Sequence, residues 1–267
     1  MIEAIERADD PRIEAYSRVG DHERLRGAGL FVVEGRLVLR RLLDSSRFPL
    51  HSVLLTPAAL HSFGAAIETD APVFVAEPAV LQEVTGFNFH RGCLALACRP
   101  PEEPSAGRFL QSELLLALEG IGNPDNVGGL FRVAAAFGLA GVVLDPSSGD
   151  PFYRKAVRTS MGAVLSVPFE RLAPWPAALD AYRGLDFTVV ALTPRSDAIP
   201  LQDASATLSG PLILMVGAEG PGLSDAALDA ADVLVRIPIA SAVDSLNVTV
   251  AAGVALASLS QRGLEAV

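Results

Sequence analysis

Lysine is nearly absent from this chain of 267 residues, which has 21 basic and 31 acidic side chains but a single lysine, Lys155. The formal net charge of −10 argues against indiscriminate binding to polyanions, because such binding depends on Lys and Arg that neutralise phosphates.

Cysteine is scarce too. Cys93 and Cys98 suit neither a zinc site nor a disulfide framework by number or spacing, so we expect them to be buried strand residues.

Long apolar runs and several familiar motifs are also missing. No run approaches the roughly 20 residues of a membrane span, and the N-terminal segment lacks the apolar core of a signal peptide, so we expect a cytoplasmic protein. Neither Gly-x-x-x-x-Gly-Lys-Ser/Thr nor Gly-x-Ser-x-Gly occurs, and the glycines after Gly120 and Gly217 lack the spacing of a dinucleotide fingerprint. The four histidines form no cluster typical of a metal site, so we expect no metal.

The remaining composition favours an α/β protein, because half of the residues are hydrophobic and only 19% are charged. A proline-rich polar stretch at 99–108 predicts a linker between two domains. In residues 1–98, "SVLLT", "VFVA" and "CLALAC" predict strands and "FVVEGRLVLRRLL" has helical spacing, which indicates a small α/β domain. In residues 109–267, near-continuous apolar runs alternate with helical segments, the pattern of a parallel sheet covered on both faces.

Three segments of the second domain follow apolar runs, where open α/β sheets bind ligands. The first, "NPDNVGGLFRVAAAFG" at 123–138, predicts a helix that Asn123 or Asn126 can cap. Arg132 lies off its apolar stripe, and helical side chains lean toward the N-terminus, so Arg132 can reach back toward the strand ends. A solvated surface arginine is the competing interpretation.

The second segment is "LILMVGAEGPGLS" at 212–224, whose glycines either let backbone approach a ligand or simply form a tight turn. Ser224 is a candidate helix cap. Glu219 is either a solvated acid or a site residue.

The third segment, 233–258, predicts a strand, a loop and a helix whose first turns hold several polar residues. Capping by Asp244 or Ser245 explains polar groups at this place. Asn247 is placed one turn inside the predicted helix, where asparagine is a poor helix former, which favours a functional role as much as a structural one.

Together the segments resemble the three motifs of the SpoU (TrmH) family of RNA ribose methyltransferases, in the SPOUT superfamily. The first has the family's Asn-x-Gly-x-x-x-Arg-x-Ala, the second its Gly-x-Glu-Gly-x-Gly-Leu, and the third its Ile-Pro followed by Ser-Leu-Asn-Val-Thr. Thr249 stands where serine is commoner. "YRKAVRTSMGAV" resembles a further family segment, and residues 1–98 resemble the family's RNA-binding extension.

The resemblance implies S-adenosylmethionine bound in a C-terminal trefoil knot, in a homodimer whose two subunits contribute to each site. It also implies that the cofactor lies against the second and third motifs, at Leu214, Val216, Gly217, Gly222, Ile237, Ile239 and Leu246.

The resemblance gives Arg132 a central role, often as the group that activates the ribose hydroxyl. A guanidinium with a pKa above about 12 is a poor base, so we expect Arg132 to hold the target phosphate and favour the developing alkoxide. Asn126 would orient Arg132 or the ribose, and Glu219 would fix its loop or contact Arg132. Ser245 and Asn247 would position the cofactor and the nucleotide.

An RNA enzyme this acidic needs a local basic surface. A dimer can assemble one from six residues: Arg24, Arg26, Arg36, Arg154, Lys155 and Arg158. We therefore expect a ribose 2′-O-methyltransferase acting on rRNA or tRNA. An RNA base methyltransferase of the same superfamily and a noncatalytic RNA-binding or assembly factor are the alternatives.

Overall fold

The structure, a computed structural model, describes residues 2–17, 19–45, 47–63, 67, 69–86, 92–101, 109, 112–240, 242–243 and 245–260. The chain divides into two compact units. One comprises Met1–Glu102 together with Pro151–Leu165, and the other Glu103–Asp150 together with Ser166–Val267. Most of the predicted linker, 102–108, lies outside the described residues. None of the helices in the described ranges is both long and apolar enough to span a membrane.

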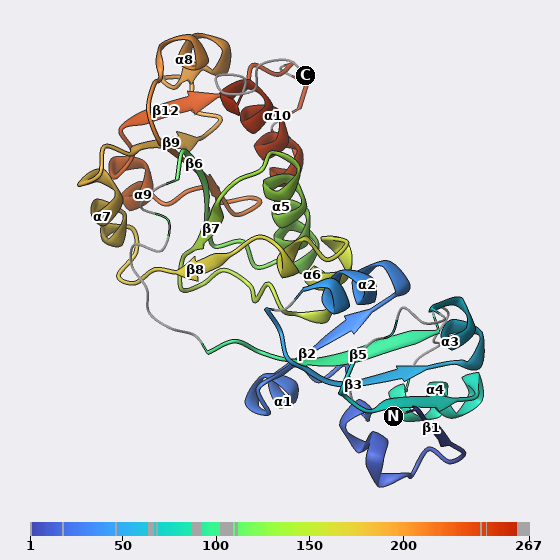
Figure 1. The fold of residues 1–267 in the computed structure, drawn as a ribbon. Helices are drawn as coiled ribbons and strands as arrows, with labels where there is room; N and C mark the ends of the chain where they lie inside the picture. Colours follow the sequence, from blue (N-terminus) through green and yellow to red (C-terminus); the bar gives the residue numbers. More distant parts are fainter. Residues whose placement is uncertain are drawn as a thin grey trace. The chain divides into compact units, whose positions relative to one another are not determined.

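The first unit is built on a mixed sheet (Figure 1) with the strand order β1 (Ile2–Ile5), β4 (Val73–Ala76), β3 (Leu50–Leu55), β5 (Cys93–Cys98) and β2 (Leu30–Glu34). Strand β4 pairs in parallel with β1 and β3, and β5 pairs antiparallel with β3 and β2. The helical segments are η1 (Pro11–Tyr16), α1 (His22–Gly27), α2 (Arg36–Asp44), α3 (Pro57–Phe63), α4 (Pro78–Thr85), α6 (Arg154–Thr159) and η3 (Ala163–Leu165).

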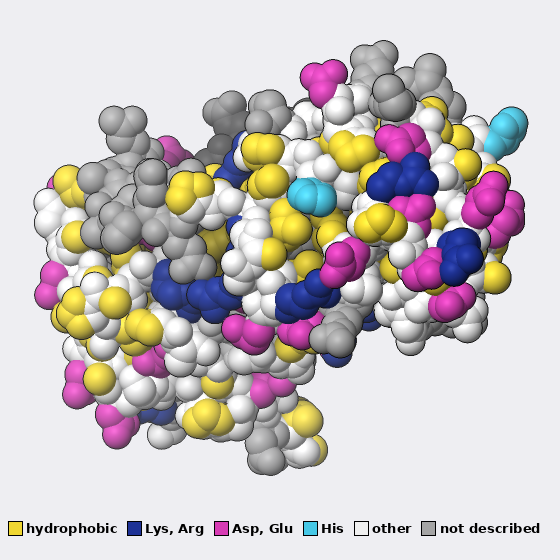
Figure 2. Space-filling view, turned by 90° about the horizontal axis from the view of Figure 1, so that it is seen from below, with side chains coloured by type: hydrophobic (Ala, Val, Ile, Leu, Met, Phe, Trp, Pro, Cys, Tyr) yellow, Lys and Arg dark blue, Asp and Glu magenta, His cyan; other side chains and the backbone are white. Residues whose placement is uncertain are grey.

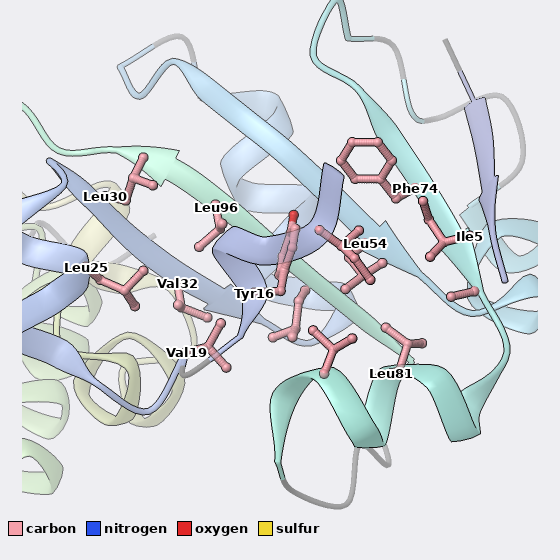
Figure 3. Packing of buried hydrophobic residues seen from close by; sticks show 14 residues of the cluster. Ile5, Tyr16, Val19, Leu25, Leu30, Val32, Leu54, Phe74, Leu81 and Leu96 are labelled. Carbon is pink, nitrogen blue, oxygen red and sulfur yellow. The ribbon is translucent and has the colours of Figure 1, made fainter. Parts of the chain in front are cut away.

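The core of this unit encloses the hydroxyl of Tyr16. Figure 3 shows Tyr16 of η1 among Leu54, Leu81 and Leu96, which come from β3, α4 and β5. The Tyr16 hydroxyl lies 2.9 Å from Ser52 Oγ, so its burial leaves no unsatisfied hydrogen bond. Burial raises the pKa of Tyr16, which therefore stays neutral.

The helical interpretation of "FVVEGRLVLRRLL" is wrong at its start. Residues Leu30–Glu34 form β2, Gly35 turns the chain with φ of 98°, and α2 begins at Arg36. Every residue of β2 is buried, and a short, fully buried apolar run looks the same in a strand and in a helix. Neither Cys93 nor Cys98 forms a disulfide bond, and both lie in β5 as expected, but only Cys93 is buried, while Cys98 is partly exposed.

The second unit is built on a parallel sheet with the strand order β10 (Ile199–Pro200), β12 (Val233–Arg236), β9 (Thr188–Leu192), β11 (Leu212–Gly217), β6 (Leu114–Glu119), β7 (Gly141–Leu144) and β8 (Phe169–Arg171). Its helical segments are α5 (Pro124–Ala136), η4 (Ala177–Leu179), α7 (Asp180–Arg183), α8 (Leu201–Thr207), α9 (Asp225–Asp229) and α10 (Val248–Ser260). The apolar runs "LLLAL", "GVVLD", "FTVVAL", "LILMVG" and "VLVRIPI" of this domain contribute β6, β7, β9, β11 and β12, which confirms the predicted parallel sheet.

The neighbouring strands β6 and β11 mark the point where the chain changes direction across this sheet. From β6 the chain crosses to β7 on one side, and from β11 it crosses to β12 on the other side. Gly217, the last residue of β11, pairs with Glu119, the last residue of β6. Ligands of open α/β sheets bind beyond the carboxyl ends of strands at such a point.

Helices α5 and α10 lie side by side and pack closely (Figure 1). A Cβ atom added to Gly129 of α5 would lie 2.6 Å from Thr249 Oγ1 and 2.9 Å from Thr249 Cγ2. A Cβ atom on Gly253 of α10 would meet Val133 at an ordinary 4.0 Å. Of these two glycines, only Gly129 has no room for a side chain.

We predict that Gly129→Ala destabilises the protein by about 1–3 kcal/mol through overpacking, less the gain of about 1 kcal/mol in helix propensity. Gly253→Ala, the matched control, should be neutral or stabilising. Urea unfolding measures both free energies. Adding Thr249→Ala to Gly129→Ala should restore stability, and equal effects of the two glycine substitutions would contradict the packing explanation.

Candidate functional site

A cavity of about 430 Å³ opens at the carboxyl ends of β9, β11 and β12. Six of the seven predicted cofactor residues line it: Val216, Gly217, Gly222, Ile237, Ile239 and Leu246. Leu214 does not line the cavity; it is fully buried in β11, two residues before Val216. The volume lies within the range of about 300–1,000 Å³ that small-molecule sites occupy.

The described lining of the cavity carries one negative charge. Glu219 is the only charged residue among the described residues that line it, and their other side chains are apolar, hydroxyl or amide groups. A wall with one carboxylate and no basic group disfavours polyphosphate ligands and suits a ligand that carries a positive charge.

The side chain of Asn247 joins the three predicted motifs at this cavity. Its Nδ2 donates one hydrogen bond to Asn126 Oδ1 at 3.1 Å and another to Glu219 Oε1 at 2.7 Å. Its Oδ1 accepts from the backbone N–H of Thr249 at 3.0 Å and of Val250 at 3.4 Å. Both donors and both lone pairs of the amide are therefore in use.

The predicted position of Asn247 inside a helix is wrong. Helix α10 begins at Val248, and Asn247 immediately precedes it and caps its first N–H groups. Asparagine is among the residues that favour this position, so its presence there needs no helix penalty to explain. Ser245 lines the cavity and forms no hydrogen bond with the described residues, whereas Asp244 lies outside them.

Arg132 is not part of the hydrogen-bonded group. It lies on the exposed side of α5, and none of the described residues forms a hydrogen bond or an ion pair with its side chain. Glu219 bonds to Asn247 instead. Asn126 is 7% exposed and also bonds to Asn247, while Asn123 caps α5 by accepting from the N–H of Asp125 at 3.0 Å.

The glycines of the second motif serve a tight turn. A Cβ atom on Gly217 would lie 2.3 Å from the backbone of Gly222 and Leu223, so the loop closes on itself. Gly220 and Gly222 have φ of 89° and 74°, which favour glycine. Ser224 caps α9 as predicted, since its Oγ accepts from the N–H of Ala227 at 3.1 Å.

Glu119 is a residue that the sequence reasoning missed. Its carboxylate at the end of β6 accepts from the Ser224 N–H at 2.8 Å, from Ser224 Oγ at 2.7 Å and from Trp175 Nε1 at 2.9 Å. It thereby ties the far end of the glycine-rich loop to the neighbouring strand. The available signal was an acidic residue directly after the apolar run "LLLAL".

A second carboxylate, that of Asp145 just after β7, holds the chain that leads into the first motif. It accepts from the backbone N–H of Gly120 at 3.1 Å and of Ser148 at 2.8 Å, and from the Ser147 hydroxyl. Burial by itself raises the pKa of Asp145, but these hydrogen bonds outweigh it and hold the pKa below its usual value. The carboxylate is therefore ionised and fixes the chain before α5.

The predicted RNA-binding residues all lie in the first unit. Arg154, Lys155 and Arg158 line a second cavity of about 180 Å³. Arg24 and Arg26 are exposed on α1, and the exposed Arg36 of α2 donates to Ser62 Oγ at 3.1 Å.

Within the described part of the chain, no group of three or more His, Cys, Asp or Glu side chains is placed to hold a metal ion.

Comparison with known proteins places these features in a family. A sequence model of the SpoU rRNA methylase family matches residues 113–257. A Mycobacterium tuberculosis protein named an uncharacterized tRNA/rRNA methyltransferase is 39% identical over 96% of this chain and 90% of its own. An rRNA methyltransferase from Sinorhizobium meliloti, solved with bound S-adenosylmethionine, is 23% identical and has a TM-score of 0.83 over 99% of both chains. A structure named RNA 2′-O ribose methyltransferase is 28% identical, with a TM-score of 0.76 over 98% of this chain and 100% of its own.

We predict that Asn247→Asp destabilises the protein by about 1–3 kcal/mol, because the substitution removes both donors while it keeps the helix cap. It also places a second carboxylate beside Glu219. Chemical unfolding gives the free energy, and the double variant Asn247→Asp/Glu219→Gln should recover part of the loss by removing the repulsion. If the double variant were less stable than Asn247→Asp alone, the proposed contact would be wrong.

Proposed function

The chain belongs to the SpoU rRNA methylase family, and we propose that it transfers a methyl group from S-adenosylmethionine to a ribose 2′-hydroxyl of rRNA or tRNA. The observation that carries the proposal is the Asn247 amide, which joins three separate motif segments at the edge of one cavity. The structural neighbour named RNA 2′-O ribose methyltransferase supports the ribose as acceptor. The relatives named tRNA/rRNA methyltransferase support the RNA class.

The cavity fits S-adenosylmethionine by its chemistry. Ile237, Ile239 and Leu246 offer apolar surface to an adenosine group, and Glu219 provides the one negative charge of the described lining. When bound, the cofactor supplies an electrophilic methyl group on a positively charged sulfur. The turn at Gly217 and the cap at Asn247 hold the walls in place before any ligand arrives, which reduces the entropy that binding must overcome.

The residues of the chain contribute positioning and charge. Asn126 and Asn247 hold the edge of the cavity where the ribose would enter, and alignment of two reactants can by itself supply about 7–11 kcal/mol. Arg132 would bind the phosphate of the target nucleotide with its planar donors and stabilise the developing alkoxide. The hydroxyl proton would pass to a neighbouring group or water, because a guanidinium stays protonated near neutral pH.

A homodimer is part of the proposal. Val250 and Val254 lie one turn apart on α10, and both are exposed apolar side chains, as is Leu246 two residues before the helix. Such a stripe suits pairing with a second copy of the chain. A monomer at micromolar concentration in sedimentation analysis would remove this part of the proposal.

The trefoil knot and the cytoplasmic location stay predictions.

The acceptor can be identified by methylating RNA that lacks the modification. We expect the protein to transfer the methyl group of isotope-labelled S-adenosylmethionine to rRNA or tRNA from cells without this protein. After digestion to nucleosides, the label should appear in 2′-O-methylribose, as mass spectrometry separates sugar from base methylation.

Each alternative gives a distinct result in this assay. Label on a base would favour the base methyltransferase. A protein that binds RNA but not S-adenosylmethionine in calorimetry would instead be the noncatalytic factor. Mapping the labelled position decides between rRNA and tRNA.

We predict that Arg132→Lys lowers methyl transfer by about a hundredfold, because lysine keeps the charge but loses the planar fork of donors. Calorimetric binding of S-adenosylmethionine should be nearly unchanged. Arg183→Lys is the matched control, since Arg183 is paired with Asp180 and Asp232 away from the cavity lining. Equal loss of cofactor binding in Arg132→Lys would contradict this separation of roles.

A further inference from the structure

The second cavity, of about 180 Å³, is lined by Gly20, Tyr153, Arg154, Lys155 and Arg158. All five residues belong to the first unit, although four of them come from the stretch Pro151–Leu165 that follows β7 in the sequence. We name this cavity the basic pocket. The described residues of its lining include three cationic side chains and no carboxylate.

The cations of the basic pocket are held to different degrees. Arg154 donates from Nε at 3.0 Å and from Nη2 at 2.9 Å to Glu34 Oε2, and the Glu34 side chain is only 9% exposed. This ion pair fixes Arg154 in place. Arg158 is partly buried, yet its side chain forms no hydrogen bond or ion pair with any described residue. A partly desolvated guanidinium without a partner is costly unless an anion completes it.

An aromatic ring forms another wall of the basic pocket. Tyr153 packs against His22 with ring centroids 4.9 Å apart and planes at 84°, an edge-to-face contact that orients the tyrosine ring. Tyr153 thus adds a hydroxyl donor and a flat surface beside the cations.

The size of the pocket limits what can occupy it. Its volume is below the range of about 300–1,000 Å³ of sites that enclose whole small molecules. It suits one phosphate group with part of a sugar or base. Figure 2 shows basic and acidic side chains interspersed on one face of the molecule.

We propose that the basic pocket binds one phosphodiester group of the RNA substrate, with Arg158 and Lys155 contacting the phosphate and Tyr153 contacting the adjoining nucleoside. The proposal rests on the proposed function, because it takes RNA as the substrate. It assigns the first unit a defined anchoring site in addition to the methyl-transfer cavity of the second unit.

Salt-dependent binding tests the pocket directly. The probe is a fluorescein-labelled single-stranded RNA of mixed sequence, titrated at several salt concentrations. Arg158→Gln should weaken binding about tenfold, as expected for one lost charge-assisted hydrogen bond, and should reduce the slope of log affinity against log salt by about one. Tyr153→Phe should keep that slope, since it removes no charge.

Arg7→Gln is the matched control, because it removes one charge from the same unit. Arg7 is highly exposed, pairs with Asp9 and does not line the pocket. If Arg7→Gln changed the slope as much as Arg158→Gln, the effect would be one of net charge and the pocket would be rejected. Calorimetric binding of S-adenosylmethionine should be unchanged in both variants, which checks that they fold.

Lys155 allows a second, independent measurement, because it is the only lysine in the chain. Acylation of its amine by an N-hydroxysuccinimide ester, followed by mass spectrometry, should slow at least severalfold when the RNA probe is present. Inorganic phosphate at the same phosphate concentration should protect less, and equal protection would point to a free-phosphate site.

The two proposals fail in different ways. If the wild-type protein methylates RNA while Arg158→Gln retains the same KM for RNA and the same salt slope, the basic pocket is wrong and the enzyme assignment stands. If the wild-type protein binds the RNA probe through the pocket but methylates no RNA, the proposed function fails and the pocket stands.

Discussion

The side-chain amide of Asn247 is the constraint on which the candidate site depends. Its oxygen caps α10, and its nitrogen bonds to Asn126 of α5 and to Glu219 of the loop after β11. Aspartate lacks the two donors, serine has only one, and glutamine is a carbon longer. One small group therefore sets the start of a helix, the position of a second helix and the position of a loop together.

Two carboxylates hold the loops on either side of that amide. Glu119 binds the end of the glycine-rich loop, and Asp145 binds the chain that leads into α5. Both carboxylates lie at the ends of parallel strands and accept from backbone N–H groups that the sheet leaves unpaired. The cavity is therefore shaped by contacts that exist without a ligand, at the place where β6 and β11 diverge.

The sheet was predictable from sequence because its strands are buried on both faces and appear as apolar runs. The Ser224 cap was predictable as well, since capping is a local interaction. The role of Asn247 was not, because 121 residues separate it from Asn126 and periodicity reports only local neighbours. Its assignment to a helix interior failed because the loop before α10 contains residues that cap helices equally well, which makes the start of the helix ambiguous.

The difference between Asn247 and Arg132 is itself informative about the proposed reaction. Asn247 is fully bonded within the chain, whereas Arg132 has no partner among the described residues. Ordering a free arginine costs up to about 2 kcal/mol of rotamer entropy, which a bidentate phosphate contact can offset. On the proposed function, the cavity is ready for the cofactor at all times, but the guanidinium becomes ordered only when a nucleotide phosphate reaches it. That arrangement would confine methyl transfer to the complex with RNA and protect the bound cofactor from reaction with water.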